Sequence, residues 1–325
     1  MHLGKLLPAL VIALLGFGEL QAQAPRKPQQ PPREAPAIRV AVNLVNVLAS
    51  VLDAAGRPLA DLPKESFALL EEGRAQKIEV FEAETQQPLD LALMMDTSLS
   101  TLTELRFEQD AAVKFLCQIV RPVDRVAVYQ FNDTVTQLTE FSFDAARLQE
   151  AVERMETGAG TALYDAVFLG AQALDRRPPG RRRVIVLVTD AGETTSSASF
   201  DEARRAALSS EAMLYTILIR PVKSESGRNT AGEHALVAIT DATGGAVYYP
   251  ESVEQFSEVF DRIDRELRTQ YRLGYYPEPR PPARSYRRIE LRVKECAASL
   301  PAAPGATAGC VIRHRKVYFT GGDEF

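Results

Sequence analysis

The residues of this sequence best suited to chemistry are two carboxylates and three hydroxyls: Asp96, Ser98, Ser100, Thr161 and Asp190. The set contains no His or Cys, so all of its potential ligand atoms are hard oxygens. Such oxygens suit octahedral Mg²⁺, or Mn²⁺ or Ca²⁺, rather than zinc or copper. The sequence therefore predicts a divalent-cation site. Glu193, which follows Asp190 closely, is a further candidate ligand.

The elements predicted around these residues would bring them to one edge of a sheet. The apolar run Leu89–Met95 stops at Asp96, and the apolar run Arg183–Thr189 stops at Asp190. Runs of this length are typical of buried parallel strands. Thr161 directly precedes the helical pattern Ala162–Leu174. Because open parallel sheets bind ligands at the carboxyl ends of their strands, we expect the acids and hydroxyls to meet there.

The order D-x-S-x-S, then a distant Thr, then a strand-ending Asp resembles the metal-ion-dependent adhesion site (MIDAS) of von Willebrand factor type A domains. The resemblance covers roughly Leu89 to Arg268. It implies that the serines and the threonine ligate the ion directly, that the aspartates often act through water, and that a partner carboxylate completes the coordination. One departure is visible, because Ala191 stands where the family often has glycine. We expect an altered loop and a retained site.

From Leu89 onward, strands and helices alternate, which predicts a doubly wound, mostly parallel α/β sheet. The expected strands are Leu89–Met95, Arg125–Phe131, Thr134–Thr139, Arg183–Thr189, Met213–Arg220 and Ala246–Tyr249. The expected helices are Leu102–Val120, Asp144–Met155, Ala162–Leu174, Ser199–Ser209, Gly232–Ala242 and Val253–Thr269. The predicted organisation is a signal peptide over residues 1–24, a linker over 25–37, a β module over 38–84, the type A domain over 88–269 and further strands over 270–325.

The two flanks both indicate strands. Phe67–Leu70 and Lys77–Phe81 are expected to form a hairpin, and Val311–Phe319 a single strand. The C-terminal strands are too few for a good core of their own. We therefore expect them to pair with the N-terminal strands, so that the type A domain is inserted in a β-sandwich-like module. The segments FALLEEGRAQKIEV and YRLGYY resemble exported bacterial proteins called VWFA-related (acidobacterial-type).

The N-terminus predicts export. Lys5 precedes the apolar stretch Leu6–Phe17, and Ala22–Ala24 offers a small-residue cleavage site. An uncleaved membrane anchor is the alternative; with the signal removed, no membrane span is expected. Pro25–Pro36 is an extended, proline-rich linker. The expected location is periplasmic, cell-surface or secreted.

The composition and the cysteines indicate which class of partner and which compartment to expect. The 325 residues carry a net charge of −5, which argues against a nucleic-acid partner. The one basic cluster, Arg176–Arg183, is expected to be a solvated loop. Cys296 and Cys310 flank a loop of small residues, and a disulfide is expected between them in an oxidising compartment. Cys117 is expected to be a buried free thiol on a helix.

Three classes of function remain open. The first is a non-enzymatic binding module, in which a protein partner of unknown identity offers an acidic side chain to the cation and nearby loops set specificity, with contributions from Asp133, Tyr164, Glu193 and Thr194. The second is an envelope scaffold that assembles independently of metal. The third and least favoured is a metal-assisted hydrolase with Glu193 as its base. No catalytic residue is expected.

Overall fold

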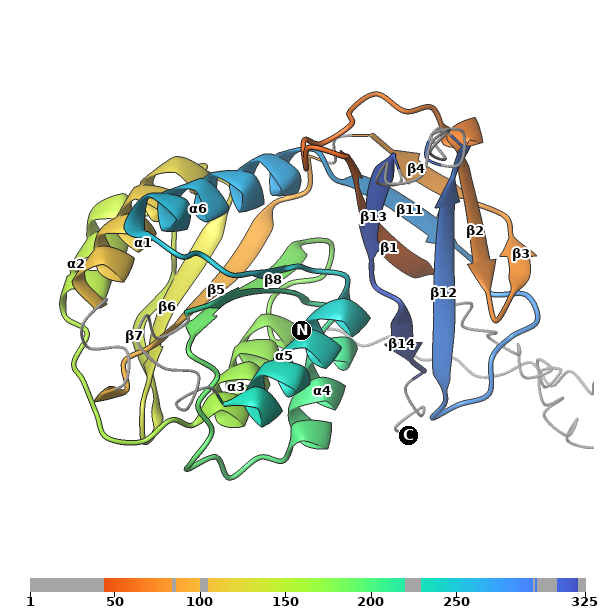
Figure 1. Ribbon diagram of the computed structural model, residues 1–325. Helices are drawn as coiled ribbons and strands as arrows, with labels where there is room; N and C mark the ends of the chain where they lie inside the picture. Colours follow the sequence, from red (N-terminus) through yellow and green to blue (C-terminus); the bar gives the residue numbers. More distant parts are fainter. Residues whose placement is uncertain are drawn as a thin grey trace, which may run out of the picture. The chain divides into compact units, whose positions relative to one another are not determined.

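The computed structural model describes residues 44–83, 86–99, 105–219, 229–294, 296 and 309–320. Over these residues the chain forms a mixed α/β fold with one six-stranded sheet and two four-stranded sheets (Figure 1). The predicted signal and linker, residues 1–37, lie outside the described residues. Among the described helices, none has the length and apolar character needed to span a bilayer.

The six-stranded sheet has the order β10-β9-β8-β5-β6-β7. Its strands are β5 (Leu89–Asp96), β6 (Arg125–Phe131), β7 (Val135–Ser142), β8 (Arg182–Thr189), β9 (Met213–Leu218) and β10 (Val247–Tyr248). Neighbouring strands are parallel except that β7 runs antiparallel to β6. Every residue of β5 is buried, as expected for a strand covered on both faces. The predicted doubly wound, mostly parallel sheet is confirmed.

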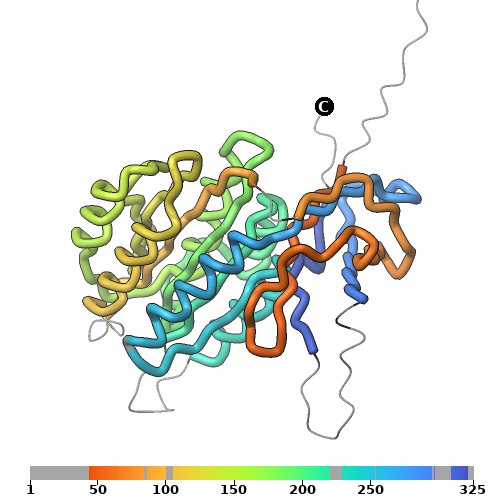
Figure 2. Tube along the Cα trace, turned by 90° about the horizontal axis from the view of Figure 1, so that it is seen from above, coloured from red at the N-terminus to blue at the C-terminus, as the bar shows by residue number. Residues whose placement is uncertain are grey.

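Helices cover both faces of this sheet (Figure 1). One face carries α1 (Leu105–Ile119), α2 (Ala145–Glu153) and α6 (Val253–Arg268), and the other carries α3 (Leu163–Asp175), α4 (Phe200–Ser209) and α5 (Thr230–Thr243). Successive side chains of β5 point to opposite faces, so Leu93 packs into the first core and Met94 into the second. Figure 2 shows α1 and α6 side by side, where the rings of Phe115 and Phe260 stack with centroids 4.6 Å apart.

The remaining strands form a β-sandwich around a third core. One sheet has the order β13-β1-β11-β4 and the other β14-β12-β2-β3. The strands are β1 (Val45–Asp53), β2 (Phe67–Glu71), β3 (Arg74–Gln76), β4 (Val80–Glu82), β11 (Tyr271–Tyr275), β12 (Tyr286–Val293), β13 (Cys310–His314) and β14 (Val317–Phe319), with a 3₁₀ turn at Lys64–Ser66. β1 lies between β11 and β13, and β2 pairs with β12. The expectation that N- and C-terminal strands pair is confirmed.

Two expected strands in the flanks were wrong. The hairpin partner of β2 is β3, whereas β4 belongs to the other sheet. Glu72 and Gly73 have φ values of 48° and 77°, which close a two-residue turn, so the residues immediately after it pair back. The expected strand over 311–319 is divided between the two sheets. It breaks where the backbone N–H of Lys316 donates to the carbonyl of Ala242 in α5.

The basic cluster is a solvated loop only in part, because Arg176 and residues 178–180 are exposed whereas the other arginines are not. Arg177 and Arg181 both form ion pairs with Asp90, whose side chain is fully buried in β5. Arg182 is 3% exposed. A buried carboxylate is costly without cationic partners, and the loop before β8 supplies them to the neighbouring strand.

The cysteines gave one confirmed and one wrong prediction. A disulfide joins Cys296 to Cys310, with a Cα–Cα distance of 5.0 Å. Cys117 is free but exposed. The buried stripe of α1 contains Ala112, Phe115 and Ile119, which places residue 117 on the solvent side. The expectation that Cys117 is buried was therefore wrong.

Candidate metal site

The candidate residues lie at the carboxyl edge of the six-stranded sheet. Asp96 ends β5, and Asp190 follows the last residue of the neighbouring parallel strand β8. Thr161 stands just before Ala162, the N-cap residue of α3. Ser98 forms an isolated bridge with Gly158 in the loop that leads to Thr161. Asp96, Ser98, Thr161 and Asp190 therefore share one edge, while Ser100 lies outside the described residues.

Backbone hydrogen bonds tie the loops of this edge together. The N–H of Gly158 donates to the carbonyl of Thr97 at 3.0 Å, which joins the loop before α3 to the end of β5. The N–H of Ala162 donates to the carbonyl of Asn132 after β6 at 2.7 Å. The N–H of Thr194 donates to the carbonyl of Thr161 at 2.9 Å. The candidate ligands are thus held by loops that support one another.

Asp96 is a fully buried carboxylate with protein donors on both oxygens. Its Oδ1 accepts from the backbone N–H of Ser98 at 2.9 Å, and its Oδ2 accepts from the hydroxyl of Thr189 at 2.6 Å. Burial raises the pKa of Asp96 from its usual value near 3.8 to about 6, although hydrogen bonds from Thr189 and Ser98 oppose the shift. The neighbouring charge of Asp190 raises the pKa of Asp96 further. A nearby cation would relieve the cost of ionising this group.

Thr161 and Asp190 face a common space beside Gly192. A Cβ atom on Gly192 would lie 3.1 Å from Asp190 Oδ1 and 3.1 Å from Thr161 Oγ1. Asp190 Oδ1 also accepts from the backbone N–H of Gly192 at 2.9 Å. Thr161 is 4% exposed, so its hydroxyl is held within the edge rather than on the open surface. The absent side chain at Gly192 leaves room between the two oxygens.

Ala191 takes the backbone conformation that usually calls for glycine. Its φ is 64°, in the left-handed region that L-residues other than Asn and Asp adopt at a cost. Its N–H donates to Thr189 Oγ1 at 3.0 Å, and its side chain is buried. The loop therefore keeps a glycine-like turn with alanine in place.

The carboxylate of Glu193 is engaged as an external cap of α3. Its Oε2 accepts from the backbone N–H of Tyr164 at 3.1 Å and from the Ser196 hydroxyl at 2.6 Å, and its Oε1 accepts from the N–H of Ser196 at 3.0 Å. These bonds satisfy one of the orphan N–H groups in the first turn of the helix. A role for Glu193 as an accessory ligand stays a prediction.

The other loop residues named from sequence also organise this edge. Thr194 Oγ1 accepts from the N–H of Thr161 at 2.8 Å, so the two threonines exchange hydrogen bonds in both directions. Asp133 Oδ2 accepts from the N–H of Ala159 at 3.0 Å. These contacts position the Thr161 loop.

Two contributors were missed by the sequence reasoning. Thr189 donates to the Asp96 carboxylate, and Asn132 donates through Nδ2 to Thr97 Oγ1 at 3.2 Å and to the Glu156 carbonyl at 3.3 Å. Both stand at or just after the carboxyl end of a strand. Polar residues at that position of each neighbouring strand were the signal that could have identified them.

The donor set is compatible with a hard divalent cation. Within the described ranges, no three His, Cys, Asp or Glu side chains gather as a metal-binding group. The set therefore depends on hydroxyl oxygens from Ser98 and Thr161 beside the carboxylates of Asp96 and Asp190, which is the chemistry preferred by Mg²⁺ rather than zinc.

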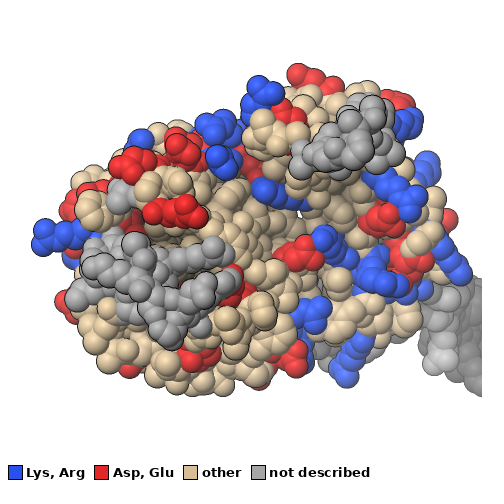
Figure 3. Space-filling view, in the orientation of Figure 1, with Lys and Arg blue, Asp and Glu red and all other residues tan. Residues whose placement is uncertain are grey.

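On the face shown in Figure 3, acidic and basic side chains are interspersed.

Comparisons with known proteins identify the class of domain. Residues 91–193 match the family model of the von Willebrand factor type A domain. The chain therefore contains a von Willebrand factor type A domain. No curated protein matches the sequence.

Solved structures with a similar fold include three of different origins. BatB from Bacteroides thetaiotaomicron is 14% identical, covering 55% of this chain and 98% of that one with a TM-score of 0.44. A von Willebrand factor type A protein from Catenulispora acidiphila is 13% identical, covering 88% and 76% with a TM-score of 0.48. Proximal thread matrix protein 1 from the mussel byssus, with a zinc-occupied MIDAS motif, is 15% identical, covering 61% and 49% with a TM-score of 0.48.

Proposed function

We propose that this chain is an exported, non-enzymatic module that binds a protein partner through a divalent cation. The cation, Mg²⁺ or alternatively Mn²⁺ or Ca²⁺, is held by Asp96, Ser98, Ser100, Thr161 and Asp190. A Glu or Asp side chain of the partner completes the coordination.

The observation that carries the proposal is the convergence of Asp96, Asp190 and Thr161 at one sheet edge. Two adjacent parallel strands deliver the carboxylates, and the space beside Gly192 is bordered by Asp190 Oδ1 and Thr161 Oγ1. The buried Asp96 has its pKa raised by desolvation, so a positive charge nearby would stabilise its ionised form. Both features favour a cation at this edge.

The chemistry of the donors favours binding over hydrolysis. A cation held largely by neutral hydroxyls keeps most of its positive charge and attracts an external carboxylate. Metal-assisted hydrolysis would also need a base beside the ion. Glu193, the acid closest in sequence, uses both carboxylate oxygens to accept hydrogen bonds from Tyr164 and Ser196. Leu99, next to Ser98 and 57% exposed, offers an incoming partner an apolar contact.

Export rests on the N-terminal pattern and on cysteine usage. The apolar stretch Leu6–Phe17 and the small residues before Pro25 have the form of a secretory signal. The disulfide between Cys296 and Cys310 is of a kind that persists in oxidising compartments.

Partner capture in the presence and absence of metal tests the proposal. The tagged full chain is incubated with the exported proteins of its source in Mg²⁺ or in EDTA, and retained proteins are compared between wild type, Thr161→Ala and Thr136→Ala. We expect capture in Mg²⁺ that EDTA and Thr161→Ala abolish. Thr136 is exposed on β7 and serves as the matched control. Equal capture in EDTA, or by Thr161→Ala, would support a metal-independent scaffold and overturn the proposal.

A further inference from the structure

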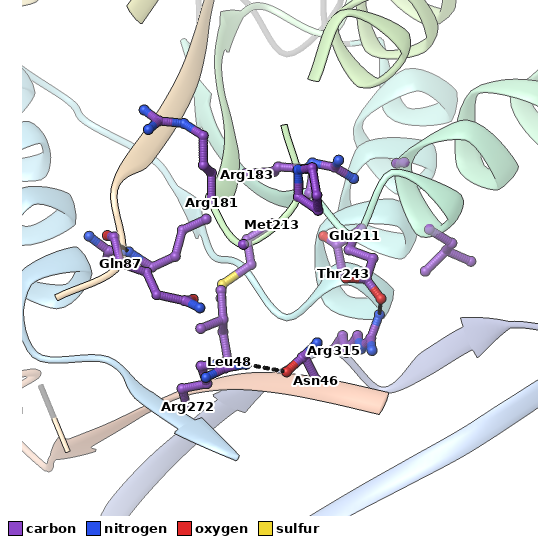
Figure 4. A pocket seen from close by; sticks show the side chains of 16 residues that line it. Asn46, Leu48, Gln87, Arg181, Arg183, Glu211, Met213, Thr243, Arg272 and Arg315 are labelled. Carbon is purple, nitrogen blue, oxygen red and sulfur yellow. Dashed lines mark hydrogen bonds and ion pairs between the residues drawn. The ribbon is translucent and has the colours of Figure 1, made fainter. Parts of the chain in front are cut away.

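A cavity of about 240 Å³ lies at the edge of the six-stranded sheet opposite the candidate metal site. Arg182 and Met213, the first residues of β8 and β9, line it, whereas the candidate metal ligands stand at the far ends of the strands. Asn46 and Leu48 of β1 and Arg272 of β11 contribute another part of the wall (Figure 4). The cavity is thus bordered by residues of both the sandwich and the type A domain.

Arginines outnumber carboxylates in the lining of the cavity. Five arginines and one carboxylate line the cavity: Arg181, Arg182, Arg183, Arg272, Arg315 and Glu211. Glu211 is already paired with Arg315 at 2.9 Å. Asp90, the partner of Arg181, is shared with Arg177. Arg183 and Arg272 pair with Asp175 and Glu82. Among the described residues, Arg182 is therefore the lining arginine without an ion-pair partner.

Arg182 carries the clearest excess charge. Its guanidinium donates to the carbonyls of Gln87 and Leu267 and to the side-chain oxygen of Gln270, all of which are neutral. No described carboxylate lies within ion-pair distance of it. The side chain is almost completely buried, and desolvation lowers the pKa of Arg182 to about 10, although the nearby charge of Asp124 opposes the shift. A buried cation of this kind is stabilised by any anion that enters the cavity.

Arg315 leaves a donor unused. The residue is 8% exposed, its Nη1 donates to Glu211 and its guanidinium lies over the Tyr318 ring, yet its Nε finds no hydrogen-bond partner among the described residues. A buried N–H without an acceptor costs about 1–3 kcal/mol. Arg272, by contrast, is satisfied by Glu82 and Asn46 at 2.7 Å and 3.1 Å.

Part of the wall is apolar. Leu48, Leu208, Ala212 and Met213 line the cavity beside the arginines, and Figure 4 shows the Met213 sulfur directed towards Leu48. An inorganic anion would leave this surface without a partner, whereas an anion with a hydrocarbon portion would bury it. The size of the cavity limits that portion to a few carbon atoms or one small ring.

We propose that this cavity binds a small organic monocarboxylate, with its carboxylate among the arginines and its hydrocarbon part against Leu48, Leu208 and Met213. The site is separate from the candidate metal site and does not depend on it. Because its wall is shared between the sandwich and the type A domain, an occupant would hold the two together.

Calorimetric titration of the full chain with sodium benzoate tests this inference. We expect binding with a Kd on the order of 1 mM or tighter, weakened at least tenfold by Arg315→Gln and also weakened by Leu48→Ala, which removes an apolar contact with the ring. Arg262→Gln, an exposed arginine of α6 outside the cavity, should bind as wild type does. Leu48 is half-buried on β1, so its variant decides if Arg315→Gln fails to fold.

Sodium sulfate provides the comparison of ligand class. Benzoate should bind at least tenfold more tightly than sulfate, because sulfate has no apolar part. No binding of benzoate, unchanged affinity in folded Leu48→Ala, or sulfate affinity equal to that of benzoate would each overturn the proposal.

Discussion

The hydroxyl of Thr189 donates to the Asp96 carboxylate at 2.6 Å, across the neighbouring strands β8 and β5. This bond fixes one oxygen of a fully buried acid at the edge where Asp190 and Thr161 also converge. It opposes the rise in the pKa of Asp96 that burial causes. Thr189 thus acts as a positioning residue for the candidate metal site.

Replacing Thr189 by valine tests that relationship. Thr189→Val keeps the shape of the side chain but removes one hydrogen bond to the buried Asp96 carboxylate, so we expect the free energy of unfolding to fall by about 1–3 kcal/mol at pH 7. Urea unfolding measures the change. Thr136→Val on exposed β7 should alter it by less than about 0.5 kcal/mol. Equal effects of the two variants would contradict a structural role for the bond.

The raised pKa of Asp96 makes a prediction about pH. In metal-free buffer the folded state holds the Asp96 proton up to about pH 6, while the unfolded chain releases it near 3.8. The stability contributed by protonation is therefore fully present below pH 3.8 and lost as the pH rises through 6, on the order of 3 kcal/mol. In Asp96→Asn the side chain at this position does not titrate, so the variant does not lose stability in this way. The stability of the variant relative to wild type should rise between pH 4 and pH 6, and a pH-independent difference would contradict the shift.

The space beside Gly192 can be filled selectively. Gly192→Ala places a methyl group 3.1 Å from both Asp190 Oδ1 and Thr161 Oγ1, so we expect the affinity for Mn²⁺ to fall at least tenfold in calorimetry while the fold is kept. Ala191→Gly changes the adjacent residue without entering this space and should bind as wild type does. Undiminished binding by Gly192→Ala would show that the ion, if bound, does not use this space.

A substitution at Glu193 distinguishes a helix-capping role of its carboxylate from a role as metal ligand. Glu193→Gln keeps at most one of the two acceptor oxygens that serve Tyr164 and Ser196, so the free energy of unfolding should fall by about 1 kcal/mol. The affinity for Mn²⁺ should change by less than about twofold. A tenfold loss of metal affinity with unchanged stability would instead make Glu193 an accessory ligand.

The disulfide should stabilise the sandwich. Cys296 and Cys310 are 14 residues apart, and closing a loop of this length contributes about 3 kcal/mol in the chain-entropy model. We expect the double variant Cys296→Ser and Cys310→Ser to lose about that amount in thermal or urea unfolding. Cys117→Ser, at an exposed position, should be neutral. A neutral double variant would contradict the contribution assigned to the bond.

The central sheet could be predicted because its strands are continuous apolar runs that end abruptly. β6 has the expected bounds, and the ends of β5 and β8 place Asp96 and Asp190 at one edge. Parallel strands buried on both faces leave little choice of register or face, so the apolar pattern alone was sufficient.

The errors arose where tertiary contacts decide. The position of the hairpin depends on positive φ values at Glu72 and Gly73, and the division of residues 311–319 depends on the contact between Lys316 and Ala242. Arg181 forms an ion pair with Asp90, which is buried in an otherwise apolar strand. The sequence alone did not indicate that a distant loop would supply the cation for this carboxylate. The exposure of Cys117 depends on which face of α1 meets the sheet, and the packing of Phe115 against Phe260 fixes that face.

The most direct measurement is a calorimetric titration of the full chain with Mn²⁺, comparing wild type with Asp96→Asn. Asparagine keeps the shape of the side chain and removes the charge that the cation would neutralise. The account predicts saturable binding to one site in wild type and its loss in a folded Asp96→Asn. Equal binding by the two proteins would contradict a cation site at the carboxyl end of β5.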